Sequence, residues 1–128
     1  MKVIQLKGLD TDLYPLIGPL VMNPKVLKAN NNYPFKTTAN HQWYIAVNDQ
    51  EEVMGFLNKK STSVINNYYL KEDDGELLKL LFCQIDIKKD ITAIVLSKHL
   101  DIFKKLGFEP EHQWTNYIKM IYTNHDKK

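Results

Sequence analysis

The sequence predicts an α/β fold of the α+β type, in which a mixed β-sheet is flanked by helices in the order β-α-α-β-β-β-α-β-α-β-β. Between residues 42 and 70, three short segments rich in β-branched, aromatic and other apolar residues are separated by two short polar turns, which indicates an antiparallel meander of three strands. From residue 75 onward, helical and strand patterns alternate, which indicates a β-α-β crossover. A meander that continues into a crossover makes a mixed sheet covered by helices.

Size and composition fit one globular domain. The chain has 128 residues, 44% of them apolar, so we expect a single domain over 1–128. No apolar run approaches the roughly 18 residues that span a bilayer, and the first residues lack a secretory pattern, so we expect a cytoplasmic protein that binds no membrane. The 17 basic residues are all Lys and lie among acidic ones along the chain, so we expect no nucleic-acid partner.

The N-terminal segment predicts a strand and a helix. Residues Lys2–Leu9 alternate in polarity as a strand does. Apolar residues then recur at helical spacing over Leu13–Val21, with Asp10 or Asp12 as the expected cap. Pro19 lacks a backbone N–H, so we expect it to break this helix.

A second short helix and a loop follow. Asn23 and Pro24 are typical of a helix cap and a first helical position, and we expect the helix to end near Asn30. The asparagines and the Tyr-Pro step of Asn30–His41 predict an exposed loop.

The meander is expected to have strands at Trp43–Val47, Val53–Leu57 and Val64–Leu70, with turns at 48–50 and 59–61. An amphipathic helix follows Gly75, and its inward face is predicted to hold Leu77, Leu78, Leu81, Phe82 and Ile85. Cys83, the only cysteine, lies in the same apolar run, so we expect a buried, inert thiol.

The remaining elements complete the crossover. The β-branched run Ile91–Leu96 predicts a buried strand, and Ser97 is expected to cap a helix that Gly107 terminates. Two final strands are expected at about Glu109–Gln113 and Thr115–Tyr122.

Two segments resemble the GNAT family of N-acetyltransferases. Strand Trp43–Val47 followed by Val53–Phe56 resembles the family's pattern of strand, turn and hydrophobic-x-Gly-hydrophobic. Phe103 to Phe108 matches the aromatic-x-x-x-Gly-Phe that ends the family's last helix, although a Leu-Gly-Phe step alone is also an ordinary helix C-cap. The resemblance covers roughly residues 42–122, and more loosely the whole chain.

The resemblance implies transfer of an acetyl group from acetyl-CoA to an amine of a small molecule or peptide. In the family two parallel strands splay apart and the pantetheine arm of the cofactor pairs with the exposed backbone, while the pyrophosphate lies at the following helix N-terminus. The strands here would be 66–71 and Ile91–Leu96. The implied cofactor contacts are Tyr69, Leu70, Lys71, Gly75, Glu76, Lys79, Ser97 and Phe103.

The sequence departs from the family at the places that bind phosphate and move protons. The loop Lys71–Glu76 is short and has one glycine and four acids, each of which would oppose a phosphate charge by about 2 kcal/mol at about 7 Å. Phe103 stands where many members have a Tyr that protonates the departing thiolate, and Leu96-Ser97 replaces a common Asn. Tyr69 could act as the acid or hold a water, although a Tyr on a strand is more often a packing residue.

The acceptor is expected near the first two helices and the following loop, with Tyr33, Phe35 and Trp43 as candidate contacts. The acidic loop and Phe103 also fit a second hypothesis, a catalytically inactive GNAT-like binding or assembly module that no longer uses acetyl-CoA. A homodimer is a further expectation, since a mixed sheet has exposed edges. The four histidines are scattered and there is one cysteine, so we expect no metal.

Overall fold

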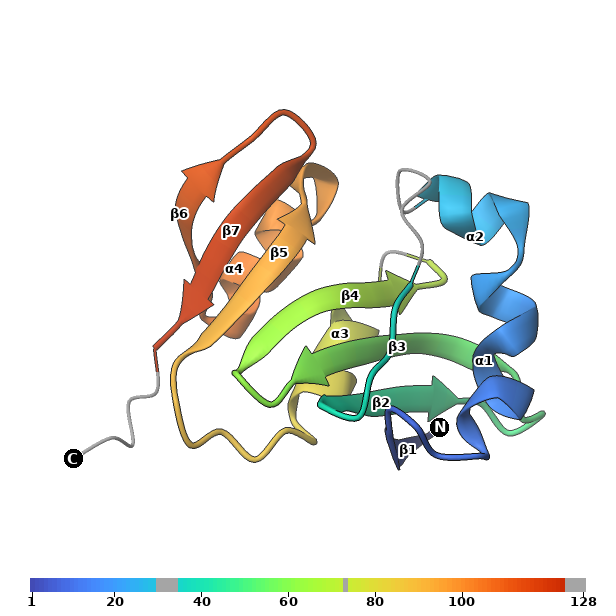
Figure 1. The fold of residues 1–128 in the computed structure, drawn as a ribbon. Coiled ribbons are helices and arrows are strands. Elements are labelled where there is room, and N and C mark those ends of the chain that lie inside the picture. The colour runs from blue at the N-terminus through green and yellow to red at the C-terminus, as the bar shows by residue number, and fades with distance from the viewer. Residues whose placement is uncertain (30–34, 73, 124–128) are drawn as a thin grey trace.

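The computed structural model describes residues 1–29, 35–72 and 74–123. Within them, seven strands form one mixed sheet in the order β1-β2-β3-β4-β5-β7-β6 (Figure 1). The elements follow the predicted order, which is confirmed: β1 (Lys2–Lys7), α1 (Leu13–Val21), α2 (Pro24–Ala29), β2 (His41–Val47), β3 (Val53–Lys60), β4 (Val64–Leu70), α3 (Gly75–Phe82), β5 (Ile91–Leu96), a 3-10 turn (Ser97–His99), α4 (Leu100–Leu106), β6 (Glu109–Gln113) and β7 (Tyr117–Tyr122).

The helices cover the two faces of the sheet. Leu13 and Ile17 of α1 pack against the face of β2 and β3 that carries Trp43 and Phe56. The opposite face packs against α3 and α4 in a larger core, to which β4, β5 and β7 also contribute. Successive side chains of β2 point to opposite faces of the sheet, which explains why there are two cores. The odd-numbered apolar residues of β2 face α1 and the even-numbered ones face α3.

The sheet opens between β4 and β5. These two strands are parallel and pair only at Val64 with Thr92 and at Ile65 with Ala93. Figure 1 shows them diverging toward their carboxyl ends. All other neighbouring strands pair antiparallel over most of their length. The gap therefore lies near the middle of the sheet, where it exposes backbone that a continuous ladder would cover.

Two glycines in the segments that resemble the GNAT family lie where a side chain would clash or strain the backbone. A Cβ on Gly55 would lie 2.6 Å from the Tyr69 carbonyl oxygen and 3.0 Å from Leu77 Cδ2, so a side chain there would push α3 and β4 away. Gly107 ends α4 in the left-handed region at φ 110°, as predicted. The requirement at Gly107 is local and was predicted from the sequence, whereas that at Gly55 arises from the packing of β3 against β4 and α3.

Two boundary predictions are wrong. Pro19 does not break α1, which continues to Val21. Only one backbone hydrogen bond is lost, because the helix ends two residues later and Pro15 lies in the first turn, where an N–H would have no partner. Strand β3 continues through Lys60, and the turn falls at 61–63 with Ser63 at a positive φ of 65°.

Two side-chain predictions are also wrong. Cys83 is exposed because α3 ends at Phe82, so the cysteine lies past the inward-facing stripe of the helix. Ser97 makes no capping hydrogen bond: the chain first forms a 3-10 turn, and His99 occupies the N-cap position of α4 without a side-chain cap.

Candidate functional site

The gap between β4 and β5 is bridged by a side chain. The paired residues differ by 28 in number, so a continued ladder would place Tyr68 opposite Leu96. In the structure the Leu96 backbone N–H donates to the Tyr68 hydroxyl oxygen at 3.0 Å. The phenol thus takes the hydrogen-bonding place of a missing backbone carbonyl, and a buried N–H keeps a partner.

The Tyr68 hydroxyl has a second partner in His99. Its oxygen lies 2.6 Å from His99 Nδ1, and the two residues are 5% and 4% exposed. The Tyr68 ring also lies edge-on to Phe103, with 5.3 Å between ring centroids. The end of the gap therefore holds two titratable side chains in direct contact.

A groove runs between α3 and α4 on the same side of the sheet. Its volume is about 630 Å³. The apolar part of its wall includes Phe82, Ile102 and Tyr122, and Lys79 and Lys105 contribute amines from the two helices. Gly75 and Glu76, at the start of α3, also line it. The groove therefore combines apolar surface with two cationic side chains.

The N-terminus of α3 is already capped. Asp74 Oδ1 accepts a hydrogen bond from the Glu76 backbone N–H at 2.9 Å. A Cβ on Gly75 would lie 3.3 Å from Ile102 Cγ2, so the helix start is close to α4. An anion at this end would have to share the N–H groups with the Asp74 carboxylate, as the acidic loop led us to expect.

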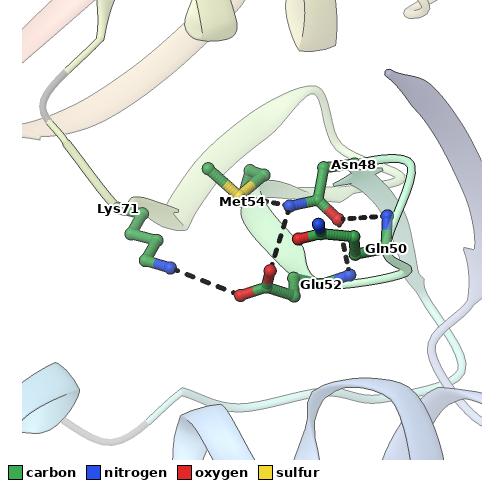
Figure 2. A network of polar contacts seen from close by, with 5 residues as sticks. All are labelled: Asn48, Gln50, Glu52, Met54 and Lys71. Atoms are coloured by element: carbon green, nitrogen blue, oxygen red, sulfur yellow. Dashed lines mark hydrogen bonds and ion pairs between the residues drawn. The ribbon is translucent and has the colours of Figure 1, made fainter.

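Lys71 lies away from the groove. Its ammonium is 3.7 Å from Glu52 Oε2, in the loop between β2 and β3, and its backbone N–H donates to the Met54 carbonyl. Figure 2 shows Lys71 directed toward Glu52 and the Asn48 side chain, which holds this loop through hydrogen bonds to the Gln50 and Glu52 backbone N–H groups at 2.9 Å each. Lys71 is not among the residues that line the groove.

The other expected cofactor contacts divide between the groove, the gap and the core. Ser97 follows β5, and its Oγ is buried with no hydrogen-bond partner among the described residues. Phe103 is 1% exposed and packs between Tyr68 and Phe108. Leu70 is buried in the core beneath α3, whereas Tyr69 packs on the opposite face of the sheet.

An aromatic cluster lies on the α1 face, where the acceptor was expected. Phe56 contacts Phe35, Trp43 and Tyr69, with centroid separations of 5.2, 4.9 and 5.9 Å. Trp43 is 1% exposed and donates through Nε1 to Thr37 Oγ1 at 2.9 Å, which makes it an anchor for the segment after residue 35. Tyr33 lies outside the described residues.

Two buried polar side chains adjoin this cluster. His41 Nδ1 accepts from the Thr38 backbone N–H at 2.9 Å, and Asn58 Nδ2 donates to the Lys36 carbonyl at 2.8 Å. His41 Nε2 and Asn58 Oδ1 are buried without a partner among the described residues. Burial, followed by the charge of Lys60, lowers the pKa of His41, so its imidazole is held neutral.

Sequence reasoning did not select Tyr68, His99, His41 or Asn58. Tyr68 and His99 are 31 residues apart and become neighbours only because β4 and the turn after β5 meet at the gap. The run of polar side chains from Asn66 to Tyr69 in β4 was the one available signal, and it did not distinguish Tyr68 from Tyr69.

Solved structures with the same fold match nearly the whole length of this chain. ElaA from Escherichia coli matches with 16% identity and a TM-score of 0.68, over 95% of this chain and 99% of that one. The N-acetyltransferase PseH from Campylobacter jejuni in complex with acetyl coenzyme A matches with 12% identity and a TM-score of 0.59, over 96% and 99%. A GNAT superfamily phosphinothricin acetyltransferase from Sinorhizobium meliloti in complex with acetyl-CoA matches with 14% identity and a TM-score of 0.55, over 100% and 93%.

No protein-family model matches the chain, and no curated protein matches it in sequence. The structural likenesses show that the chain has the fold of the GNAT N-acetyltransferases, which confirms the predicted fold. Among the described residues, no helix is long and apolar enough to cross a membrane. Within the same residues, no three His, Cys, Asp or Glu side chains are grouped so that they could hold a metal ion.

Proposed function

We propose that this GNAT-fold chain is an N-acyltransferase that takes an acetyl group from acetyl-CoA and places it on an amine of a small molecule or peptide. The observation that carries the proposal is the gap between β4 and β5 beyond Ile65 and Ala93. A splayed parallel pair leaves strand backbone without a ladder partner, and an extended molecule with amide groups can pair with it.

The residues around the gap suit the apolar and amide parts of the cofactor. The Ser97 Oγ, which is buried and has no hydrogen-bond partner within the described part of the chain, lies directly after the end of β5. The groove between α3 and α4 adds apolar surface from Phe82, Ile102 and Tyr122. Two structures with the same fold, PseH and the phosphinothricin acetyltransferase, were solved in complex with acetyl-CoA, which supports acetyl-CoA as the proposed cofactor.

The phosphates would be held differently from the pattern that the family resemblance implies. Because Asp74 occupies the start of α3 and Lys71 is paired with Glu52, neither the loop backbone nor Lys71 is a ready anion site. We assign the phosphates instead to Lys79 and Lys105, which lie on the two walls of the groove. Lysines act on phosphate as mobile point charges and need no fixed loop geometry.

The bound cofactor would supply an activated thioester, and the chain would position the amine. An aromatic cluster lies on the other face of β3 and β4. Its half-buried members Phe35 and Tyr69 would contact the acceptor, whereas Trp43 and Phe56 are buried beneath them and would hold them in place. Tyr33 remains a proposed contact of the same kind. Alignment of amine and thioester alone can provide much of the rate acceleration in acyl transfer.

A second candidate function rests on the capped helix and the bridged gap. If Asp74 and Tyr68 keep their present partners, the chain is a GNAT-like module that no longer uses acetyl-CoA and binds another partner. A second copy of the chain is one such partner, since β1 and β6 are the edges of the sheet. Pro110 and two glutamates on β6 disfavour strand addition there, so β1 is the proposed edge.

Titration with acetyl-CoA, followed by the melting temperature, separates the two candidates. At about 100 times its dissociation constant the ligand should stabilise the fold by about 2.7 kcal/mol. The paired variant Lys79→Ala/Lys105→Ala should weaken binding, whereas Lys104→Ala, next to Lys105 but outside the groove lining, should not. Absence of any shift at millimolar acetyl-CoA would contradict acyl transfer and favour the binding module.

A further inference from the structure

Two buried asparagines lie side by side on the face of the sheet that packs against α1. Asn58 of β3 and Asn67 of β4 are directly opposite each other in the strand register, and they are 0% and 7% exposed. On its other side Asn58 is opposite Trp43 of β2, which belongs to the core on the α1 face. Two carboxamides are therefore buried in a largely aromatic core, where an amide without a hydrogen-bond partner lowers stability.

The orientation of the Asn58 amide is fixed by its contact with the segment after residue 35. Its Nδ2 donates to the Lys36 carbonyl oxygen at 2.8 Å, so the other end of the amide must be the oxygen. This Oδ1 is buried and accepts no hydrogen bond from the described residues. Because buried oxygens in native proteins almost always have a donor, Asn58 Oδ1 marks a place where a further group completes the structure.

Asn67 can supply the missing donor. Directly opposite side chains of an antiparallel pair have Cβ atoms about 4.5–5.5 Å apart, so rotation of the Asn67 amide brings its Nδ2 within reach of Asn58 Oδ1. Asn67 lies two residues beyond Ile65, the last residue of β4 that pairs with β5, and is thus beside the gap. In this arrangement the Asn67 Oδ1 is directed away from Asn58 and remains for a ligand at the gap.

We propose that Asn58 and Asn67 form a relay of carboxamides that positions the acceptor amine at the gap, with Asn67 Oδ1 accepting a hydrogen bond from the amine nitrogen. The inference rests on the proposed acyl transfer and names the group that holds its acceptor. Asn58 acts through Asn67 and is a positioning residue. The chain of hydrogen bonds runs from the Lys36 carbonyl through both amides to the amine, and each bond polarises the next.

An amide oxygen suits the form of the amine that reacts. The amine attacks the thioester with its lone pair, so it must be neutral. A carboxylate at position 67 would favour the ammonium form, whereas a neutral amide does not. The half-buried rings of Phe35 and Tyr69 lie on the same face and suit an apolar body on the amine. The expected acceptor is therefore a primary amine with an aromatic or alkyl body.

Kinetics with phenethylamine as the acceptor test the contact, with thiol release from acetyl-CoA as the signal. Asn67→Leu should raise the KM for phenethylamine at least about tenfold, because it removes a hydrogen bond to the substrate. Asn67→Asp should move the rising limb of kcat against pH upward by about one unit or more, because the carboxylate holds the bound amine protonated. A merely structural role of Asn67 would not move this limb.

Two further variants define the relay. Asn58→Leu should also raise the KM for phenethylamine, and combining it with Asn67→Leu should cause little further change, because the two amides act as one unit. Gln42→Leu is the matched control: Gln42 is a half-buried amide of β2 on the opposite face of the sheet, and its replacement should leave this KM unchanged.

Nitrogen-15 NMR of the Asn67 side-chain amide tests the relay without any turnover. Phenethylamine, added with and without coenzyme A, should move this signal and slow its hydrogen exchange, and Asn58→Leu should abolish the slowing. An Asn67 signal that stays unchanged in both cases would overturn the inference, as would an Asn67→Leu variant that folds and keeps the wild-type KM. Both results leave acyl transfer intact, whereas a wild type that neither binds acetyl-CoA nor releases thiol from it contradicts the proposed function itself.

Discussion

The Tyr68 hydroxyl accepts a hydrogen bond from the Leu96 backbone across the gap between β4 and β5, at the level where the two residues would face each other in a continuous ladder. A side chain thus satisfies a backbone group that strand separation leaves exposed. Any ligand that pairs with β5 at this level must compete with Tyr68 or use it. The gap is therefore the part of the fold at which the proposed cofactor would bind.

Replacement of Asp74 by Asn should strengthen acetyl-CoA binding. Asn is as good a helix cap as Asp, so the unfolding free energy should change little. Removal of the exposed negative charge near the start of α3 should favour a bound phosphate by about 1 kcal/mol after solvent screening, or roughly fivefold in affinity. Isothermal titration at low and high salt would check this, and an unchanged affinity would place the phosphates elsewhere.

Alkylation of Cys83 should report occupancy of the groove. The thiol is exposed and lines the groove between α3 and α4, and it is the only cysteine in the chain. One equivalent of iodoacetamide should react with the folded protein, and acetyl-CoA should slow the reaction. Mass spectrometry would follow the single adduct. Equal rates with and without the cofactor would argue against binding in this groove.

Gly55→Ala should destabilise the fold by about 1–3 kcal/mol, because the new Cβ would meet the Tyr69 carbonyl oxygen and Leu77. Urea unfolding would measure the loss. Gly18→Ala is the matched control, since a Cβ there has no atom within 4 Å, and it should change stability by less than about 1 kcal/mol. A tolerated alanine at 55 would mean that β3 and α3 are not so closely packed.

Stability should fall as the pH is lowered below about 6.5, in part because of His41. The folded state lowers the pKa of His41, so the unfolded chain binds a proton first and gains stability from it. The contribution is fully present above the unfolded pKa of about 6.5, is lost as the pH falls toward the folded value, and changes no further below that value. Melting temperatures between pH 4 and 8 would show the slope.

His41→Gln should flatten this dependence, whereas His112→Gln, on the exposed strand β6, should not. If the melting temperature of His41→Gln still falls with pH as in the wild type, other titratable groups cause the dependence. The same variant would show how much of the packing under residues 35–38 depends on the bond between His41 Nδ1 and the Thr38 N–H.

The order of elements could be predicted because each element has a strong local signal. Strand β5 matches the predicted Ile91–Leu96, since a β-branched run between polar segments has few alternatives. Gly107 ends α4 in the left-handed region, as a glycine directly after a helical pattern predicts. The predictions for Pro19 and Cys83 were wrong because both depend on the residue at which a helix ends. Alternative end points of a helix differ little in free energy, so the sequence does not fix them.

The sequence by itself determined the fold and the positions where the family pattern is altered, namely the acidic loop and Phe103. Only the tertiary structure decided which contacts the residues around these positions make: Asp74 caps α3, Lys71 pairs with Glu52, and Tyr68 reaches Leu96 and His99. The physical reason is that hydrophobic period and turn chemistry are local, whereas a hydrogen bond across the gap depends on how far two strands diverge. That separation is set by the packing of the whole sheet against α3 and α4.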